Sequence, residues 1–563
     1  MGHARPMHIA PQGAAAVPDS AGLTFFHADP WGAAMARLYL PAPLYAHLEP
    51  HLATLGGLVG GALDAEAAAA DRNPPVLHHR NRRGEDAQSI EYHPAYLAMA
   101  RRAFADYGLA AMSHRPGVLG WPAPMPPAAK YALTFLFVQS EFGLMCPVSM
   151  TDALARTLRR HGSAELVARY LPALTSTDMD TLSQGAMFMT EQGAGSDIAA
   201  TAVVATEDGE GWVLHGDKWF CSNPDAGVAL VLARRGASGA GGEGEAPGLG
   251  GVSLFLLPRL LPDGTPNRYR IVRLKDKLGT RSMASGEVRL EGARAYLVGD
   301  PDAGFRQMAD MVNASRLSNG VRAAGMMRRA TAEALYVAQR RMAFGRRLVD
   351  MPLMRRQLVK LIMPAEQARS MMFQTAQAME AADAGDETAR KLLRILTPLI
   401  KFRACRDARR VTGDAMEVRG GCGYIEEFPD ARLVRDSHLG SIWEGTSNIV
   451  ALDVLRAVER EDALPVLAAH VAGLLGNQGR EAWMGAEALT RAALRNPALA
   501  RQAASALYHA TSAAALGWEG ARLPCPGRAA LAELVLRHRL SPRDPLAVTD
   551  DTPLEDAVLA VAA

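Results

Sequence analysis

Apolar positions along this chain follow two different periods, and the period changes twice. From about residue 24 to 183, most apolar residues are spaced as on one face of a helix, for example over residues 153–170. From about 184 to 303, short β-prone runs are separated by turns, and a Glu-Asp-Gly-Glu-Gly turn at 207–211 joins two of them. After residue 304 the helical period returns. The pattern predicts an α+β multidomain protein.

Breaks in composition divide this pattern into five segments. Glycine and proline are sparse between 305 and 457, where four long helices fit, and the β-prone runs are typical of a compact antiparallel sheet or barrel. The glycine-rich stretch 236–251 lies between two predicted strands, so we expect a flexible hairpin loop. The predicted domains are a flexible arm (1–23), a helical N-terminal domain (24–183), a β-barrel middle domain (184–303), a helical bundle domain (304–457) and an extra helical C-terminal domain (458–563).

Composition narrows the class of protein. With 563 residues, 49% apolar and 21% charged, the chain is long enough for several globular domains and is not disordered throughout. A net charge of +2 excludes a polybasic protein but leaves a local basic face open. The five cysteines are never spaced CxxC, so we expect neither a disulfide framework nor a thiolate metal site. We find no signal peptide and no run apolar enough to span a membrane, so a cytoplasmic protein without membrane partners is expected.

Five short stretches combine residues that can bind a planar, anionic ligand. Glycines let a backbone approach a ligand closely, and successive free N–H groups form a nest for anionic oxygens. Adjacent aromatics can flank a planar ring, and an arginine can clamp a phosphate. An acid beside a tryptophan is partly desolvated, which favours a general base. The stretches are MTEQGAGSD (189–197), GDKWFCSN (216–223, just after a predicted strand), RRMAFG (340–345), GGCGY (420–424) and SIWEGTSN (441–448).

Each stretch alone also has a simpler interpretation. The first could be a plain tight turn, and the second a strand end that packs its aromatics into a barrel. The third could carry a solvated helical arginine, and the fourth could be a helix C-cap. The acid of the fifth, Glu444, could be a solvated or capping residue. Only the five stretches together, in this order, favour one function.

The ordered set resembles the motif pattern of the acyl-CoA dehydrogenase flavoproteins. Residues 73–75, 93–96, 146–151, 274–279 and 441–445 further resemble the AidB-type proteins of the bacterial alkylation response. The resemblance covers about residues 24–457. It implies a helical N-terminal domain, a central antiparallel β-barrel and a C-terminal four-helix bundle, with FAD between barrel and bundle.

The resemblance also implies roles for individual residues around the flavin. Thr190 and the backbone of Met189 would face the flavin ring. Ser196 would contact the pyrophosphate, and Ser222 would lie near the flavin N5. Thr446, with its neighbours, would close the site.

A second group would serve the FAD of a neighbouring subunit, so the resemblance implies a homo-oligomer, a tetramer, that shares its FAD sites. Arg341 and the turn 417–421 would reach the ADP half of that cofactor. Glu417 departs from the family's usual glutamine, so its side chain could face away. The expected cofactor-binding residues are Met189, Thr190, Gly195, Ser196, Phe220, Ser222, Arg341, Phe344, Glu417, Gly420, Gly421, Thr446 and Asn448.

Glu444 is the expected catalytic residue. The base position of some branched-chain members, just before a helix arginine, is occupied here by Ser315, which cannot serve. Glu444 would remove the α-proton of an acyl-CoA thioester while the β-hydride passes to flavin N5. The first hypothesis is thus an FAD-dependent acyl-CoA dehydrogenase that acts on CH–CH groups.

A second hypothesis is a flavin-bearing DNA-binding protein of the alkylation response with little dehydrogenase activity. Residues 463–563 hold nine arginines, no lysine and nine acids, so phosphate contacts would need a sorted face such as Arg537, Arg539 and Arg543. A solvated face or an oligomer contact is the simpler interpretation.

A third hypothesis, a metalloenzyme built on the histidines at 78, 79 and 93, lacks an acid at ligand spacing, so no metal site is expected.

Overall fold

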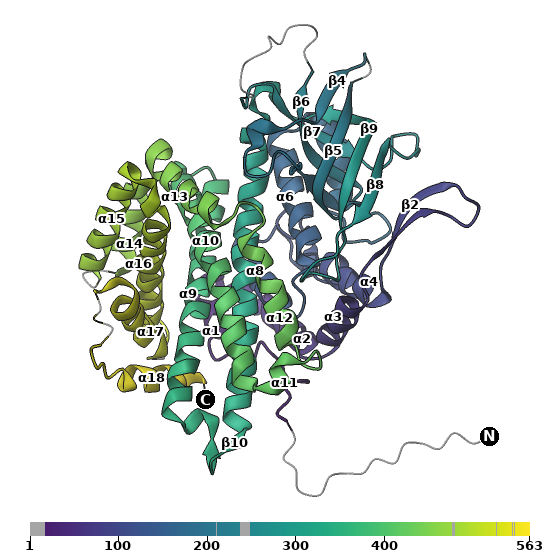
Figure 1. Cartoon of the computed structure of the whole chain (residues 1–563). Helices are drawn as coiled ribbons and strands as arrows, with labels where there is room; N and C mark the ends of the chain where they lie inside the picture. The colour runs from purple at the N-terminus through teal and green to yellow at the C-terminus, as the bar shows by residue number, and fades with distance from the viewer. Residues whose placement is uncertain are drawn as a thin grey trace, which may run out of the picture.

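The computed structural model describes residues 17–562 except 210, 237–247, 476–478, 525, 543 and 545. Residues 1–16 of the predicted arm and 237–247 of the predicted glycine-rich loop therefore lie outside the described residues. Figure 1 shows the β-barrel beside the upper end of a helical bundle, with the C-terminal helices on the opposite side of that bundle. Over the described ranges, no helix is both long and apolar enough to cross a membrane.

The N-terminal region is helical, as predicted, except for a two-stranded hairpin. Its helices are α1 (Gly32–Tyr39), α2 (Ala42–Val59), α3 (Ala62–Arg72), α4 (Pro94–Arg101), α5 (Pro127–Phe137), α6 (Met145–His161) and α7 (Ala164–Leu174). The hairpin, β1 (Val76–Arg80) and β2 (Asp86–Glu91), was not predicted because its strands are mostly exposed and carry no apolar alternation. The segment 153–170 is helical, as predicted, but it is divided between α6 and α7, because Gly162 is extended and Ser163 caps α7.

The middle region is a β-barrel, as predicted. Its strands are β3 (Gly185–Phe188), β4 (Val204–Glu207), β5 (Trp212–Ser222), β6 (Val228–Arg235), β7 (Val252–Pro258), β8 (Tyr269–Leu274) and β9 (Ser285–Leu297). The order β6–β4–β5–β9–β7 closes on itself, because β7 also pairs with β6. Most pairings are antiparallel, but β6 pairs in parallel with β3 and with β4.

Two barrel strands are buried on both faces. Alternate residues of β6, among them Val231, fill the barrel interior, while Leu230 and Leu232 belong to the helical core. β7 follows the same rule, with Phe255 inside the barrel and Leu254 towards the helices. Such strands are continuously apolar rather than alternating, which explains their strong signal in the sequence. Through them the barrel packs against the helices.

Four long helices follow the barrel, which confirms the predicted bundle. They are α8 (Gly304–Arg340), α9 (Pro352–Asp383), α10 (Glu387–Arg419) and α13 (Ser447–Glu461). The short elements between them are the hairpin β10 (Met342–Ala343) and β11 (Arg346–Arg347), and the helices α11 (Gly421–Tyr424) and α12 (Asp430–Ser437). Gly320 lets α8 approach α10 closely, since an added Cβ would lie 2.9 Å from the Ile400 side chain.

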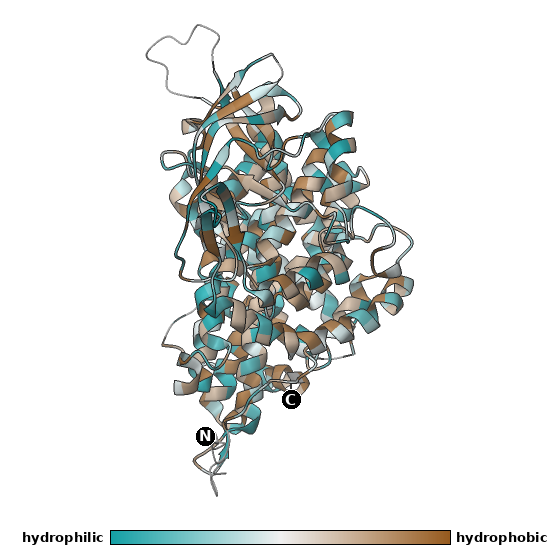
Figure 2. Ribbon diagram, turned by 90° about the vertical axis from the view of Figure 1, so that its right-hand side faces the viewer, coloured by the Kyte–Doolittle hydropathy of each residue, from teal (hydrophilic) through white to brown (hydrophobic). Residues whose placement is uncertain are grey.

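The C-terminal helices pack along the bundle. They are α14 (Ala463–Leu475), α15 (Arg480–Arg495), α16 (Ala500–Gly520), α17 (Gly527–Val535) and α18 (Thr552–Ala562). Fully buried Arg528 donates to Glu519 of α16 and to Glu366 of α9, the latter at 2.8 Å. Apolar residues of the N-terminal, bundle and C-terminal helices form one continuous core cluster. In Figure 2 apolar and polar segments recur along each element, as expected where one face is buried.

Candidate functional site

Glu444 lies in a tight turn between η6 (Leu439–Ser441) and α13. Its φ of 49° falls in the left-handed region, where a non-glycine residue stores about 1–3 kcal/mol of strain. Two helices hold the turn, because Arg316 Nε donates to the Glu444 carbonyl at 3.0 Å and Lys401 Nζ donates to the carbonyl of Gly445. Strained backbone persists only where its surroundings over-determine it. These contacts therefore fix the position of the carboxylate.

The Glu444 carboxylate is held by α8. Its Oε2 accepts from Asn319 Nδ2 at 2.8 Å, and Asn319 Oδ1 accepts from Arg322 Nη2 at 2.9 Å. Arg322 is fully buried, with its guanidinium carbon 4.7 Å from the Trp443 ring centroid and 5.1 Å from that of Phe142. No residue in the described part of the chain donates to Oε1 of Glu444, so this oxygen can receive a proton.

The second motif stretch reaches the same place from the barrel. The prediction that it follows a strand is wrong, because it forms the second half of β5, which extends to Ser222. At the start of α6, the Cys146 thiol interacts with the Ser222 hydroxyl and with the charges of Arg322 and Glu444. Burial raises the pKa of Cys146 to about 11, so the thiol is neutral. The structure thus brings two predicted site residues, Ser222 and Glu444, together around Cys146.

A buried ion pair ties the first motif stretch to β5. Lys218 Nζ donates to Glu191 Oε1 at 2.6 Å and to the Leu232 carbonyl at 2.7 Å, and the lysine has no exposed surface. Glu191 also accepts from the N–H groups of Ala202 and Val203. Burial lowers the pKa of Lys218, and the charge of Glu191 opposes this effect. The pair anchors the loop that enters the barrel.

The anchored loop presents the predicted flavin-facing residues. The Thr190 carbonyl accepts from the Trp219 N–H at 2.8 Å, and both Met189 and Thr190 are half-buried. Gly195 and Ser196 are exposed, and a Cβ added to Gly195 would meet nothing within 4 Å. Packing within the chain therefore does not require this glycine, and its open backbone can approach a ligand closely.

Other predicted cofactor residues near this loop also have groups available to a ligand. The Phe220 ring is 56% exposed at the end of β5. Thr446 is the N-cap residue of α13, but its side chain makes no capping hydrogen bond, and Asn448 is exposed. These side chains can contact a bound molecule without losing contacts inside the chain.

The remaining predicted cofactor residues gather at the far end of α8. Arg341 Nη1 donates to the Arg419 carbonyl at 2.9 Å, beside Gly420, which ends α10 with a φ of 73°. Phe344 is 96% exposed, and Glu417 and Gly421 are exposed as well. At about 1.5 Å per residue, α8 separates Arg316 from Arg341 by about 38 Å. One chain therefore places the predicted FAD contacts in two distant groups.

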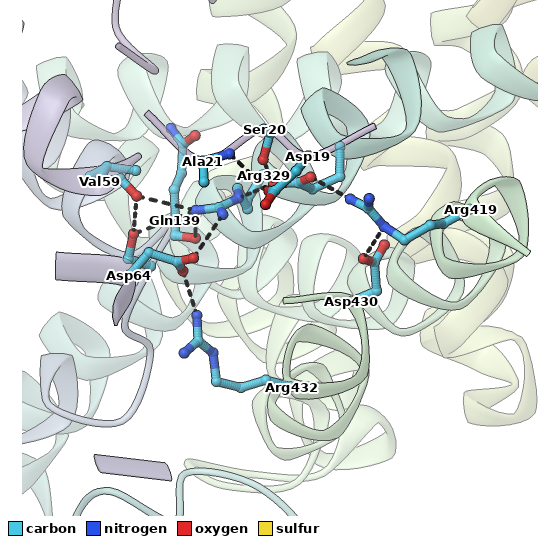
Figure 3. Close-up of polar contacts among 12 residues, drawn as sticks. Asp19, Ser20, Ala21, Val59, Asp64, Gln139, Arg329, Arg419, Asp430 and Arg432 are labelled. Carbon is cyan, nitrogen blue, oxygen red and sulfur yellow. Dashed lines mark hydrogen bonds and ion pairs between the residues drawn. The ribbon is translucent and has the colours of Figure 1, made fainter. Parts of the chain in front are cut away.

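A buried ion network anchors this second group (Figure 3). Arg419 Nε donates to Asp430 Oδ2 at 2.7 Å, and its Nη2 donates to Glu333 Oε2 at 2.5 Å. Glu333 also accepts from Arg329 Nε at 2.7 Å and from the Ser20 hydroxyl at 2.6 Å. The network fixes the last turn of α10 and the glycine turn that follows it.

Reasoning from the sequence missed the residues that hold Glu444. Asn319 and Arg322 lie in no motif stretch, and they contact a turn more than a hundred residues later in the chain. A polar stripe in the sequence could have indicated them. Polar residues recur there at helical spacing among apolar and small ones, at Ser315, Ser318, Asn319 and Arg322. All four are buried.

Two of the three histidines of the metalloenzyme hypothesis have structural partners. His78 is paired with Glu91 at 2.7 Å on the exposed hairpin, and the His93 ring accepts from the Ala95 N–H at the start of α4. Over the ranges that the structure covers, no three His, Cys, Asp or Glu side chains are grouped to hold a metal ion.

Three family matches cover most of the chain. Residues 17–181 match the adaptive response protein AidB N-terminal domain. Residues 186–293 match the middle domain of acyl-CoA dehydrogenases, and residues 302–459 match their C-terminal domain.

Individual relatives agree with these matches. The chain is 34% identical to the putative acyl-CoA dehydrogenase AidB of Escherichia coli K12 over 73% of this chain and 74% of the relative. It is 31% identical to acyl-CoA dehydrogenase family member 11 of Caenorhabditis elegans over 79% of this chain and 72% of the relative. Among solved structures, C. elegans ACDH-11 in complex with C11-CoA superimposes with a TM-score of 0.83 at 27% identity, covering 95% of this chain and 94% of the other.

Proposed function

Because the chain belongs to the acyl-CoA dehydrogenase family and carries the AidB-type N-terminal domain, we propose that it oxidises the α,β bond of an acyl-CoA thioester with FAD. The family supports an oxidoreductase that acts on CH–CH groups. The C. elegans relative whose structure contains C11-CoA supports an acyl-CoA as the substrate class. The observation that carries the proposal is the Glu444 carboxylate, held by Asn319 on a strained turn near Cys146, whose thiol meets the Ser222 hydroxyl.

Members of this family are FAD flavoproteins, and the residues of this chain fit the cofactor. Gly195 leaves open backbone for an anionic group, and the exposed Ser196 hydroxyl lies beside it. The uncapped Thr446 hydroxyl and the exposed Phe220 ring add polar and planar contacts. Bound FAD supplies a hydride acceptor. We assign Met189 and its neighbours in the loop to the flavin half.

The ADP half is assigned to the second group of residues, acting on the FAD of a partner subunit. Arg341 supplies the charge for a pyrophosphate, and the Gly420–Gly421 turn supplies backbone N–H groups. The hairpin after α8 exposes Met342 by 60% and Phe344 by 96%, and such apolar surface is typical of a contact between subunits. A homotetramer that shares its FAD sites accounts for the second group of FAD contacts and for the exposed apolar hairpin.

In the reaction, Glu444 Oε1 takes the α-proton, because Oε2 is held by Asn319. The N–H of Glu444 makes no hydrogen bond to another described backbone group, so it can donate to the thioester carbonyl. This hydrogen bond would stabilise the negative charge that develops on the carbonyl as the proton leaves. The rings of Trp443 and Phe142 lie against the Arg322 guanidinium, which in turn bonds Asn319, the residue that holds Oε2.

The proposal is tested by mixing the FAD-loaded protein anaerobically with a panel of acyl-CoAs and following loss of the flavin absorbance. At least one acyl-CoA should bleach the flavin, and Glu444→Gln should slow bleaching by ~10²–10⁴ with FAD content unchanged. Glu459→Gln, at an exposed acid on α13, the helix that follows the turn, is the matched control and should not slow it. Silence of the wild-type protein across the panel would refute the proposal.

A second candidate is DNA binding, and one group of side chains favours it. Arginines of α10 face arginines of the C-terminal helices, and their mutual repulsion adds to burial in lowering the pKa values of Arg406 and Arg539. The group consists of Arg403, Arg406, Arg409, Arg410, Arg501 and Arg539. Of the face predicted from the sequence, Arg539 belongs to this group, whereas Arg537 is paired with Glu533 and Asp551. Arg543 lies outside the described residues.

A salt titration of binding to duplex DNA tests this candidate. The logarithm of the binding constant should fall linearly with the logarithm of salt concentration, and each arginine removed from the exposed trio Arg409, Arg410 and Arg501 should reduce the slope by about 1. A slope near zero in the wild-type protein would exclude the candidate.

A further inference from the structure

Three buried hydrogen-bond donors around Glu444 have no partner among the described residues. They are Arg322 Nη1, the indole nitrogen Nε1 of Trp443 and the Ser315 hydroxyl. Arg322 and Trp443 contact one another, and Ser315 lies two turns away on the same face of α8. Native proteins satisfy nearly all buried donors, so a group of unmet donors points to a missing acceptor. An acceptor-rich ligand at this place would supply it.

The buried charges around Glu444 do not balance. Arg316 is neutralised by Asp453 at 2.8 Å. Arg322 and Lys401 remain, both fully or almost fully buried, and Glu444 is the carboxylate whose charge acts on both of them. These two buried cations therefore share one carboxylate. A buried charge without a counter-charge is costly, and a ligand that brings a negative charge removes this cost.

The guanidinium of Arg322 is buried and held in one orientation, so it can bind a specific ligand group. It stacks against the Trp443 and Phe142 rings, and two of its nitrogens are used, with Nη2 bonded to Asn319 and Nε to the Ser318 carbonyl at 3.4 Å. Nη1 has no hydrogen-bond partner among the described residues, and the neutral Cys146 thiol is the other side chain that meets the guanidinium. The stacking and the used nitrogens pre-organise the group, so a ligand acceptor that meets Nη1 need not order it.

We propose that the acyl site selects short acyl thioesters whose chain ends in a carboxylate, bound by Arg322 Nη1 and Trp443 Nε1. The inference rests on the proposed function and names its substrate class. Asn319, which holds the catalytic carboxylate, and Arg322 lie one turn apart on α8, about 4.5 Å along the axis. A chain of a few carbons therefore spans from the reacting carbons to Arg322. An alkyl chain would leave the guanidinium buried and unpaired, and sites built to bond a polar group reject analogues that lack it.

The test compares two five-carbon thioesters, glutaryl-CoA and pentanoyl-CoA, on the FAD-loaded holoprotein. Calorimetric binding and anaerobic flavin bleaching are both measured. The wild-type protein should bind glutaryl-CoA about 10- to 100-fold more tightly, the range of a hydrogen bond to a charged group. Arg322→Met should abolish or reverse the preference, and Arg322→Lys should keep part of it. Arg306→Met, an exposed arginine of the same helix, should leave it unchanged.

The outcomes separate this inference from the proposed function. Bleaching or binding by pentanoyl-CoA that equals or exceeds that by glutaryl-CoA would overturn the inference and leave the dehydrogenase proposal standing. A wild-type protein that responds to neither thioester would overturn the inference, whereas the proposed function would fall only if the whole acyl-CoA panel also left the flavin unbleached. If Arg322→Met fails to fold, the wild-type comparison and Arg322→Lys still decide the question. A glutaryl-CoA preference that survives in a folded Arg322→Met would show that another residue reads the carboxylate and would refute the assignment.

Discussion

Lys218→Met is expected to destabilise the protein by about 3–5 kcal/mol, the cost of removing one partner of a buried ion pair. In the folded chain the Lys218 side chain has no exposed surface and that of Glu191 is 6% exposed. A methionine side chain fills the space of the apolar part of the lysine but has no hydrogen-bond donor. Glu191 would then be buried with only the N–H groups of Ala202 and Val203 to stabilise its charge, and the Leu232 carbonyl would lose its donor.

The double variant Glu191→Gln/Lys218→Met removes both charges, so its loss should be smaller than the sum of the two single losses by about 1–3 kcal/mol. Urea unfolding followed by circular dichroism gives these free energies for the apoprotein and the FAD-loaded protein. Arg289→Met is the matched control, because it breaks an exposed pair with Asp217 between neighbouring strands and should cost less than about 1 kcal/mol. A Lys218→Met loss as small as the control, or strictly additive single losses, would refute the reasoning.

Three further predictions address the site and its surroundings. Asn319→Ala removes the donor to Glu444 and should slow flavin bleaching by about 10- to 100-fold at unchanged FAD content; a stopped-flow rate equal to wild type would contradict the positioning role. Arg341→Ala should weaken FAD retention by about 1.5–3 kcal/mol, measured as FAD per chain after gel filtration, and a monomer that holds FAD as tightly as an oligomer would exclude the shared site. Burial lowers the pKa of Lys277 to about 8 from 10.5, so between these values the unfolded chain holds more protons. Wild-type stability relative to Lys277→Met should therefore rise with pH across that window in urea unfolding, and a fall would show the opposite sign.

Most of the fold was predictable from periodicity, and the exceptions have physical reasons. The strands β6 and β7 are apolar on both faces, and α8 to α10 are long with few glycines and prolines, so their patterns are strong. The hairpin of β1 and β2 packs no face against the core, so hydrophobic patterning cannot detect it. The break before α7 depends on one extended glycine and one serine cap, which is a weak local signal.

The candidate site was predictable only where its residues lie in contiguous motifs. Glu444 and Ser222 could be found because their neighbours carry recognisable chemistry. Asn319 and Arg322 could not, because their role depends on which face of α8 meets a turn 125 residues away from Asn319. The pair Lys218 and Glu191 lies inside two motif stretches, yet only the closed barrel brings its members together. The role of a side chain that positions another residue depends on tertiary contacts, and its neighbours in the sequence do not reveal it.

The buried contact of Arg528 determines how the C-terminal helices can evolve. Arg528, Glu519 and Glu366 have no exposed surface, and Tyr39 of α1 donates to Glu519 at 2.6 Å. A truncation before α16 would remove Arg528 and Glu519, leave Glu366 with Arg369 at 3.3 Å as its partner, and strip cover from α9. These helices are therefore not a removable appendage that could be gained or lost in one step or transplanted onto another dehydrogenase. We therefore expect a relative that lacks these helices to carry other residues at the positions of Glu366 on α9 and Tyr39 on α1.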